Sequence, residues 1–207
     1  MEINDIKNIF KDRKRKSFEY AVLAPLIEVN NVPSLLYQVR SSQLKRQPGE
    51  ISFPGGRIEE GENPRLAAIR ETNEEMGIDK DNIEIIGQLD SLLDSRNNLI
   101  YPILGQLNNI NFDDINFFKD EVAEVFTVPI DFFIKNKPEI YEMSYKMNED
   151  GSFPFHKIPN STMYQTRTLT YPVYLYEYNN YVIWGLTAKI TFNFIKELIK
   201  KIPPDQC

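Results

Sequence analysis

Short apolar runs separated by turn-forming residues dominate the chain, and this pattern predicts a fold rich in β-strands. Residues 18–29 and 33–40 are rich in Val, Ile, Leu and Tyr, and the turn-like VNNVP between them predicts a hairpin. Residues 168–178 and 181–184 predict a second hairpin around Tyr-Asn-Asn. Further strands are predicted over residues 50–53, 83–93 and 99–107, the last two joined through DSRNN.

Four segments instead carry apolar residues at helical spacing. They predict helices over residues 3–15, 64–76, 121–135 and 186–201, with Pro129 breaking or restarting the third. The last helix should turn most of its apolar side chains inward, namely Ile190, Phe192, Phe194, Ile195, Leu198 and Ile199. Strands first, a helix in the middle and a helix at the end predict an α/β fold with a mixed sheet covered on both faces.

The helix over residues 64–76 has clear start and stop signals. Asn63 suits the N-cap, Pro64 the first helical position, and Gly77 the left-handed residue that ends a helix. Its apolar stripe should face the core and consists of Leu66, Ala67, Ala68, Ile69, Thr72 and Met76. We therefore expect its acidic side to face outward or into a cleft.

Composition is that of an ordinary folded domain. With 42% hydrophobic and 26% charged residues, the 207-residue chain can bury a core and is not disordered throughout. Because no repeat, low-complexity segment or Gly/Ser linker divides it, we expect a single domain over residues 1–207. Its parts would be an N-terminal helix in 1–16, a core over 17–202 and a tail over 203–207.

Other features of the chain bear on where it works. No apolar run approaches the roughly 20 residues that span a bilayer, and the first 20 residues lack the features of a secretory signal. Cys207 is the sole cysteine, which excludes an internal disulfide framework and a cysteine-based zinc site. We therefore expect no membrane partner and a reducing, cytoplasmic location.

Charge argues against nucleic acid as the partner of the whole protein. The net charge is −6, and the basic run KDRKRK at 11–16 is a local exception. That run is either a solvated helix face or a contact for an anionic ligand, RNA or a partner.

Three glutamates provide the candidate chemistry. Glu71, Glu74 and Glu75 are three and four residues apart, so on a helix their carboxylates share one face and repel one another. A divalent cation would remove this repulsion, and hard oxygen ligands suit Mg²⁺ or Mn²⁺. Arg70 is spaced to pair with Glu74, and the glycine turn before the helix would let a backbone carbonyl approach the same ion. A solvated acidic face is the alternative interpretation.

The full spacing around these glutamates resembles the Nudix box of the Nudix hydrolase family. Its charged and glycine positions are all filled, by Gly56, Glu62, Arg70-Glu71, Glu74-Glu75 and Gly77 before apolar Ile78. Only Thr72 departs from the usual aliphatic residue. The resemblance implies a Nudix-type α/β/α sandwich with a mixed β-sheet and a loop–helix–loop metal site. It also implies a pyrophosphohydrolase that splits a nucleoside diphosphate linked to another group, using Mg²⁺ or Mn²⁺ and water.

The resemblance also assigns roles to residues. Glu71, Glu74, Glu75 and Gly56 would bind metal, with one glutamate helping to activate water. Arg70 would hold a glutamate in position, and Glu62 would help to fix the loop–helix–loop.

A further metal ligand or base often comes from outside the box in this family. Glu121 and Glu124 are the candidates here, although a glutamate that starts a helix also interacts well with the helix dipole.

The segment before the box points to a substrate. LLYQVRSSQLKRQPGEISFPGG, residues 35–56, resembles the signature of the coenzyme A pyrophosphatase subgroup. Gln47 departs from it, because members usually carry His at that position. The implied reaction cleaves coenzyme A or acyl-CoA to 3′,5′-ADP and (acyl-)4′-phosphopantetheine. Arg40, Arg46 and Arg57, with Lys45, could bind the substrate's phosphates.

Two other functions stay open. One is hydrolysis of another nucleoside diphosphate derivative, such as ADP-ribose, NADH or a capped RNA end. The other is a non-catalytic nucleotide-binding or regulatory domain on the same fold, although an intact set of box carboxylates argues against it. The expected partner is a small-molecule nucleotide substrate similar to coenzyme A, with nucleic acid disfavoured, and the protein would be a monomer or a homodimer.

Overall fold

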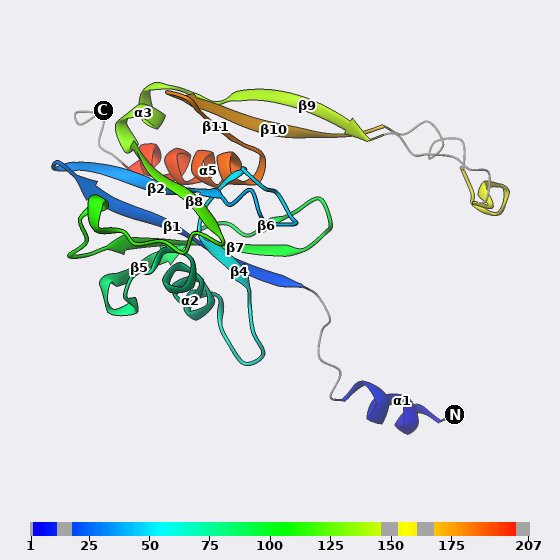
Figure 1. The fold of residues 1–207 in the computed structure, drawn as a ribbon. Helices are drawn as coiled ribbons and strands as arrows, with labels where there is room; N and C mark the ends of the chain where they lie inside the picture. The colour runs from blue at the N-terminus through cyan, green and yellow to red at the C-terminus, as the bar shows by residue number, and fades with distance from the viewer. Residues whose placement is uncertain (1, 12–17, 146–152, 161–167, 202–207) are drawn as a thin grey trace. The chain divides into compact units, whose positions relative to one another are not determined.

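A computed structural model of the protein describes residues 2–11, 18–145, 153–160 and 168–201 (Figure 1). Its α-helices are α1 (Ile3–Phe10), α2 (Pro64–Met76), α3 (Ile130–Lys135) and α5 (Gly185–Lys201), with short 3₁₀ helices at Lys80–Asn82, Phe112–Asp114 and Phe155–Lys157. The strands are β1 (Glu19–Val29), β2 (Val32–Arg40), β3 (Ile51–Ser52), β4 (Gly55–Arg57), β5 (Ile83–Gln88), β6 (Leu92–Leu93), β7 (Leu99–Leu107), β8 (Val122–Pro129), β9 (Glu139–Tyr145), β10 (Leu169–Tyr178) and β11 (Tyr181–Trp184).

The chain divides into two compact units. The first comprises Met1–Pro25 with Pro54–Phe118, and the second comprises Leu26–Phe53 with Lys119–Cys207. Strand β1 contributes residues to both units, because the division falls after Pro25.

The first unit contains the acidic helix. There β1 is hydrogen-bonded to β4 and β7, and β5 and β6 both pair antiparallel with β7. Its buried apolar residues include Ala21, Leu23, Ala67, Ala68, Met76, Ile78, Ile83 and Ile103. Since α2 contributes three of these residues, its position in the unit is fixed by burial.

The second unit contains two sheets and helix α5. Strand β2 pairs antiparallel with residues 26–29 of β1, with β3 and with β8, while β9, β10 and β11 form a separate three-stranded sheet. Helix α5 packs against β10 and β11, and Thr187 Oγ1 donates to the Ile51 carbonyl 3.1 Å away. Figure 1 shows α5 running alongside these strands.

Both predicted hairpins are confirmed. β1–β2 turns at Asn30 and Asn31, and β10–β11 turns at Asn179 and Asn180. Asn30, Asn31 and Asn179 adopt positive φ, which Asn tolerates better than most residues.

The predicted helix over 121–135 is wrong in its first half. Residues 122–129 form β8, which pairs with β2 from Ser34↔Pro129 to Arg40↔Val122. Val122, Phe126 and Val128 are buried on it, and the ladder with β2 overrides the weak helical pattern. Pro129 separates this strand from α3, as expected of a residue that restarts a helix.

Several element boundaries also differ from the prediction. The segment 83–93 is two strands, β5 and β6, rather than one. Helix α1 ends at Phe10, and positions 12–15 lie outside the described residues. The glycine turn before α2 contains the short strand β4. Strand β9 was not predicted from the sequence.

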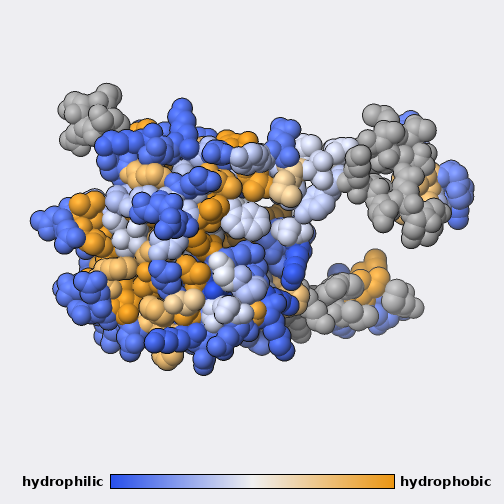
Figure 2. Space-filling view, turned by 45° about the horizontal axis from the view of Figure 1, so that its top comes forward, coloured by the Kyte–Doolittle hydropathy of each residue, from blue (hydrophilic) through white to orange (hydrophobic). Residues whose placement is uncertain are grey.

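The sequence pattern did not indicate strand β9, because none of its residues is buried and so no apolar face is required. It is an edge strand whose seven residues are all exposed, including Ile140, Tyr141, Met143 and Tyr145. Figure 2 likewise shows hydrophobic residues at the surface, in orange, among hydrophilic ones in blue.

Helix α2 keeps its predicted bounds and caps but buries a different face. Asn63 Oδ1 accepts from the amides of Arg65 and Leu66 at 3.0 Å, and Gly77 ends the helix with φ +66°. Leu66, which we expected in the core, is 54% exposed, whereas Glu75 is buried. Ala68, Thr72, Glu75 and Met76 recur at helical spacing on the buried face, and Leu66 lies outside that row.

Helix α5 buries Ile190, Phe194 and Ile195, as predicted. Phe192 is half-buried and stacks on Tyr174, with ring centroids 5.0 Å apart. Ile199 is exposed, so the inward face ends before the last turn of the helix.

Tyr37 should make the protein sensitive to alkaline pH. Its ring is fully buried, its hydroxyl lies 2.8 Å from Thr191 Oγ1, and burial raises the pKa of the Tyr37 hydroxyl far above its ordinary value. An unfolded tyrosine loses its proton near pH 10, so this stabilisation is complete below about pH 10 and is lost as pH rises further. Tyr37→Phe should flatten the fall of the urea midpoint between about pH 9.5 and 11.5. It should also cost about 1 kcal/mol at pH 7 through the lost hydrogen bond.

An unchanged pH slope in Tyr37→Phe would show that another group carries the alkaline sensitivity. Tyr176 is the first alternative, because its burial also raises the pKa of its hydroxyl.

Candidate active site

The site begins where the backbones of β4 and β1 approach each other closely. Gly55 and Gly56 of β4 pair with Val22 and Ala21 of β1. A Cβ atom at Gly55 would lie 2.4 Å from the Ala21 carbonyl oxygen, so only glycine allows this pairing. The turn before α2 is thereby fixed on β1.

Gly56 makes room for the first glutamate of the box. A Cβ atom there would lie 2.3 Å from Cδ and Oε1 of Glu71, so the Glu71 carboxylate rests directly on the glycine backbone. Any side chain at position 56 would displace that carboxylate.

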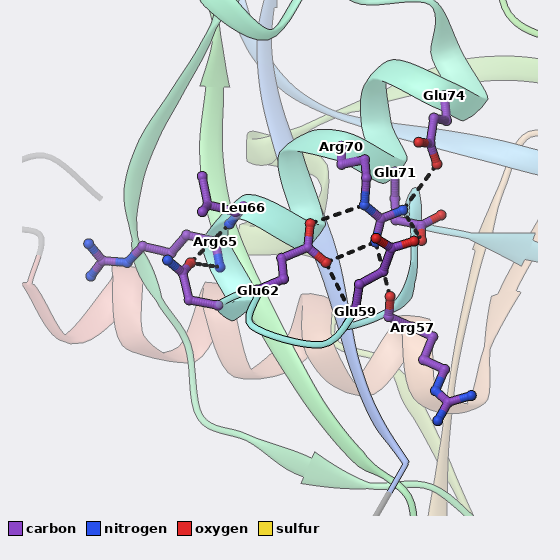
Figure 3. Close-up of polar contacts among 9 residues, drawn as sticks. Arg57, Glu59, Glu62, Arg65, Leu66, Arg70, Glu71 and Glu74 are labelled. Carbon is purple, nitrogen blue, oxygen red and sulfur yellow. Dashed lines mark hydrogen bonds and ion pairs between the residues drawn. The ribbon is translucent and has the colours of Figure 1, made fainter.

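Arg70 lies at the centre of the polar cluster (Figure 3). Its Nε and Nη2 donate to the two carboxylate oxygens of Glu62, each at 3.0 Å, and Nη2 also donates to the Arg57 carbonyl at 3.0 Å. Its Nη1 donates to Glu71 Oε1 at 2.7 Å and to Glu74 Oε2 at 3.1 Å. Arg70 thus ties the loop before α2 to two carboxylates of the helix.

Charge pairing in this cluster stabilises the ionised groups. Hydrogen bonds from Arg70 lower the pKa of the Glu62 carboxyl, and Glu62 and Glu71 raise the pKa of the Arg70 guanidinium. Glu62 also accepts from the Glu59 amide at 3.0 Å, which helps to hold the loop.

The three box glutamates occupy different environments, although the helical spacing predicted a shared face. The Glu74 side chain is 54% exposed, whereas Glu75 is 3% exposed and accepts from the Gly55 amide at 3.1 Å. Of the three, Glu71 and Glu74 meet at Arg70 Nη1. Among the described residues, no group of three or more His, Cys, Asp and Glu side chains converges to hold a metal ion.

The donor groups nevertheless fit a hard divalent cation. Glu71 and Glu74 direct carboxylate oxygens toward one point, which the positively charged Nη1 of Arg70 occupies. Because Gly56 has no side chain, the Glu71 carboxylate itself fits against its backbone. Carboxylate oxygens together with water are the ligands that Mg²⁺ and Mn²⁺ prefer.

Arg57, predicted to contact phosphates, also belongs to the first unit. Its guanidinium lies over the Phe18 ring, 4.6 Å from the centroid, while its carbonyl accepts from Arg70. Its side chain is therefore directed by a cation–π contact rather than by the acidic cluster.

The other predicted site residues belong to the second unit. The Glu121 carbonyl accepts from the Ser41 amide at 2.8 Å, and the Glu121 side chain is exposed just before β8. Arg40 ends β2, and its buried Nε has no hydrogen-bond partner among the described residues. Arg46 is exposed in the loop between β2 and β3.

Sequence reasoning missed one interaction at Glu124. The Tyr181 hydroxyl donates to Glu124 Oε1 at 2.5 Å, and this bond raises the pKa of Tyr181 to about 12. The Tyr181 ring stacks on Phe126, with centroids 3.7 Å apart. The tyrosine and the glutamate are separated by 57 positions in the sequence, so no local pattern could predict this pair.

The chain is similar in sequence to known proteins. A sequence model described as the NUDIX domain matches residues 18–146. Nudix hydrolase 3 of Caenorhabditis elegans is 35% identical over 177 residues, covering 81% of this chain and 68% of that protein. A peroxisomal coenzyme A diphosphatase of Mus musculus is 31% identical, covering 84% and 67%. A mitochondrial coenzyme A diphosphatase of the same organism is 32% identical, covering 83% and 73%.

One solved structure is similar over almost the whole chain. A MutT/nudix family protein from Enterococcus faecalis aligns with 97% of this chain and 71% of its own, with a TM-score of 0.53 at 15% identity. That likeness supports the predicted α/β fold class of Nudix type. No helix within the described ranges is both long and apolar enough to cross a membrane.

The family match and the relatives agree with the box that the sequence displays between Gly56 and Ile78. We conclude that the chain belongs to the Nudix hydrolase family and is a pyrophosphohydrolase.

Proposed function

We propose that the protein hydrolyses coenzyme A or acyl-CoA, with Mg²⁺ or Mn²⁺, to 3′,5′-ADP and (acyl-)4′-phosphopantetheine. The observation that carries the proposal is the segment over residues 35–56, which resembles the subgroup signature except at Gln47. Coenzyme A diphosphatases among the relatives support it.

Glu71, Glu74 and Glu75, with the Gly56 carbonyl, are the proposed metal ligands. When bound, the metal would neutralise pyrophosphate charge and lower the pKa of water. The exposed Glu74 carboxylate is open to solvent and can accept a proton from the attacking water, a role that Glu75 or Glu121 could also fill. The water oxygen then bonds to one phosphorus, and the bridging P–O bond breaks to release two phosphate monoesters.

Arg70 and Glu75 hold this arrangement together in the proposal. Arg70 joins the loop residue Glu62 to the helix carboxylates. Glu75 accepts from Gly55 and so fixes the glycine turn against α2. Breaking a hydrogen bond of a buried polar group is costly, which suits a residue that must not move.

Arg40, Arg46 and Arg57 are the proposed phosphate contacts. Arg40 supports this role because its buried Nε has a donor that no described residue accepts. A phosphate oxygen would satisfy that donor in a charge-assisted hydrogen bond. Arg46 is exposed and can follow a phosphate that remains near solvent.

A substrate panel with one matched variant tests the proposal. Purified protein with Mg²⁺ or Mn²⁺ should release 3′,5′-ADP from coenzyme A faster than it cleaves ADP-ribose or NADH, as measured by chromatography of the products. Arg40→Gln should raise KM for coenzyme A by about tenfold but change KM for dephospho-coenzyme A much less, because only the former carries the 3′-phosphate. Lys137→Gln removes an exposed positive charge on the same unit and should leave both unchanged.

A rate on ADP-ribose far above that on coenzyme A would overturn the substrate assignment. Because Arg40 is partly buried, the comparison requires that Arg40→Gln has the same urea midpoint as wild type. Arg46→Gln is a second test at an exposed position.

Hydrolysis of another nucleoside diphosphate derivative is the second candidate function. The observation that favours it is Gln47, whose Nε2 donates to Glu50 Oε2 at 2.8 Å and whose φ is +52°. The Gln47 side chain is thus tied to its own loop, at the position where members of the subgroup usually carry His. The same panel separates the two functions.

Three further expectations belong to the proposal. They are a single domain over residues 1–207, a cytoplasmic location, and a monomer or homodimer. Two relatives are named as peroxisomal and mitochondrial enzymes, so the location of the protein must be tested independently of its activity.

A further inference from the structure

One face of the three-stranded sheet is apolar and exposed, whereas helices cover the other face. On the covered face, Tyr174 stacks on Phe192 of α5 and Tyr176 packs edge-on against Phe133 of α3. Side chains alternate between faces along a strand, so the odd-numbered residues of β10 and their partners on β9 and β11 lie on the opposite face. That face includes Tyr141, Met143, Tyr145, Tyr171, Val182 and Trp184. All of these except Tyr171 are 44% to 56% exposed.

Strand β9 lies at one edge of this sheet (Figure 1). It pairs with β10 over all seven of its residues, and within the described ranges no strand pairs with its other side. Natural sheets protect such an edge with lysine, proline, a bulge or a very short strand. The β9 sequence EIYEMSY contains no lysine or proline, and its ladder with β10 has no register shift. A long, regular and partly apolar edge of this kind can pair with a strand of another molecule.

The last five residues of β9 are nearly symmetric about Met143. Their sequence is Tyr-Glu-Met-Ser-Tyr, with tyrosine at both ends and a polar residue on each side of the methionine. Two copies of β9 can therefore pair antiparallel about a two-fold axis at Met143, with their apolar faces on the same side. Tyr141 of each copy would lie opposite Tyr145 of the other. Glu142 would lie opposite Ser144.

Cross-strand pairing favours this register over its neighbours. Aromatic residues directly opposite each other stabilise a sheet, and a serine hydroxyl can donate to a glutamate carboxylate. Centring the pair on Glu142 would place two carboxylates opposite each other, which is unfavourable. Centring it on Tyr141 would place Ile140 opposite Glu142 and Glu139 opposite Met143. Charge and aromatic pairing therefore favour Met143 as the centre.

The exposed area of β9 suits a reversible dimer. Tyr141 and Tyr145 are 53% and 56% exposed, so each leaves about 80–140 Å² of the area that an aromatic side chain can bury. With Met143, the two copies together offer roughly 600 Å² of side-chain surface, to which the paired backbones add. Interfaces below about 1,200 Å² in total are typical of weak association. The dimer should therefore form and dissociate with concentration.

We propose that β9 is a homodimer interface. It pairs antiparallel with β9 of a second copy about Met143 and joins two three-stranded sheets into one sheet of six strands. This pairing lies within the second unit and depends on neither the substrate nor the metal of the proposed function. Of the two oligomeric states proposed above, it selects the homodimer.

Sedimentation equilibrium at several protein concentrations tests the interface. The wild-type chain should approach twice its mass of 24.2 kDa as its concentration rises. Met143→Lys would place two ammonium groups opposite each other at the axis, and lysine is a residue that protects natural sheet edges. We expect it to raise the dissociation constant of the dimer by about tenfold or more. Because Met143 is 49% exposed, the variant should keep the urea midpoint of wild type.

Val182→Lys is the matched control. Val182 lies on the same apolar face and is 46% exposed, but it belongs to β11, on the other side of β10 from β9. It lies opposite Glu177, with which a lysine could pair. The dissociation constant of the dimer should change by less than about twofold. Equal loss of the dimer in both lysine variants would indicate association through the apolar face and would overturn the pairing at β9.

Disulfide cross-linking tests the register. In a Cys207→Ser background, Met143→Cys would place the two cysteine Cβ atoms about 4.5–5.5 Å apart, close to the range of a disulfide bond. Tyr145→Cys would place its two cysteines about 14 Å apart along the strands. We therefore expect an oxidised covalent dimer on a non-reducing gel for Met143→Cys and a monomer for Tyr145→Cys. Faster cross-linking of Glu142→Cys than of Met143→Cys would contradict the register.

A wild-type chain that remains monomeric at about 100 μM would overturn the proposal, since even weak interfaces associate at such concentrations. These measurements use no substrate or metal. Failure to hydrolyse coenzyme A would therefore leave their outcome unchanged.

Discussion

Glu74→Gln should reduce kcat for pyrophosphate cleavage by about 10²–10⁴-fold at saturating metal. Glutamine keeps the size of the side chain but can neither accept the proton of the attacking water nor offer a charged oxygen to the metal. Glu74 is the box glutamate whose substitution should disturb folding least, because its side chain is 54% exposed and its ion pair with Arg70 is at the surface. The measurement is product release by the purified variant, with the urea midpoint determined in parallel.

Glu59→Gln is the control for the loss of one negative charge. Glu59 lies in the loop before α2 with an exposed side chain, and its described bond to Glu62 uses the backbone amide. It should retain wild-type kcat. An active Glu74→Gln enzyme with a wild-type urea midpoint would remove Glu74 from the proposed catalytic set.

Gly55→Ala should lower the free energy of unfolding by about 3 kcal/mol or more. Its new methyl group would lie 2.4 Å from the Ala21 carbonyl oxygen and 2.6 Å from Val22 Cα. Both neighbours are backbone atoms of β1, so neither can rotate away. The strand pair must separate, and the Gly55 amide then loses its bond to the buried Glu75 carboxylate. Equilibrium unfolding in urea measures the change.

Alanine substitutions at two other glycines distinguish a steric clash from the effect of backbone conformation on stability. Gly87→Ala meets no atom within 4 Å and has no positive φ, so its stability should stay within about 0.5 kcal/mol of wild type. Gly61→Ala also meets nothing but has φ +83°, so it should lose about 1 kcal/mol. If Gly55→Ala behaved like Gly87→Ala, β1 and β4 would not be held as closely as the structure indicates.

Local signals explain why α2 was predicted with its bounds intact. An N-cap side chain, a first-turn proline and a left-handed glycine act within a few residues of one another. Asn63, Pro64 and Gly77 therefore set the start and end of the helix without help from the rest of the chain. The asparagine turns of the two hairpins are of the same kind.

Burial was less predictable, because it depends on what packs against an element. Leu66 and Glu75 lie on the same helix, yet the leucine is exposed and the glutamate is buried. The Gly55 amide, twenty residues away, gives the Glu75 carboxylate a buried partner. Residues 122–129 became a strand for a similar reason, since β2 offers them a complete ladder.

The sequence alone determined the reaction class, because the carboxylates, the arginine and the glycines of the box are recognised by their spacing on one capped helix and in the turns beside it. Tertiary structure decided which partners those charges have. It directed Glu71 and Glu74 to one guanidinium nitrogen, buried Glu75 on a backbone amide, and joined Tyr181 to Glu124. Spacing along a helix fixes which side chains share a face, but the free energy of a charge depends on its neighbours in space. Those neighbours come from a loop and from distant strands, and only the fold brings them together.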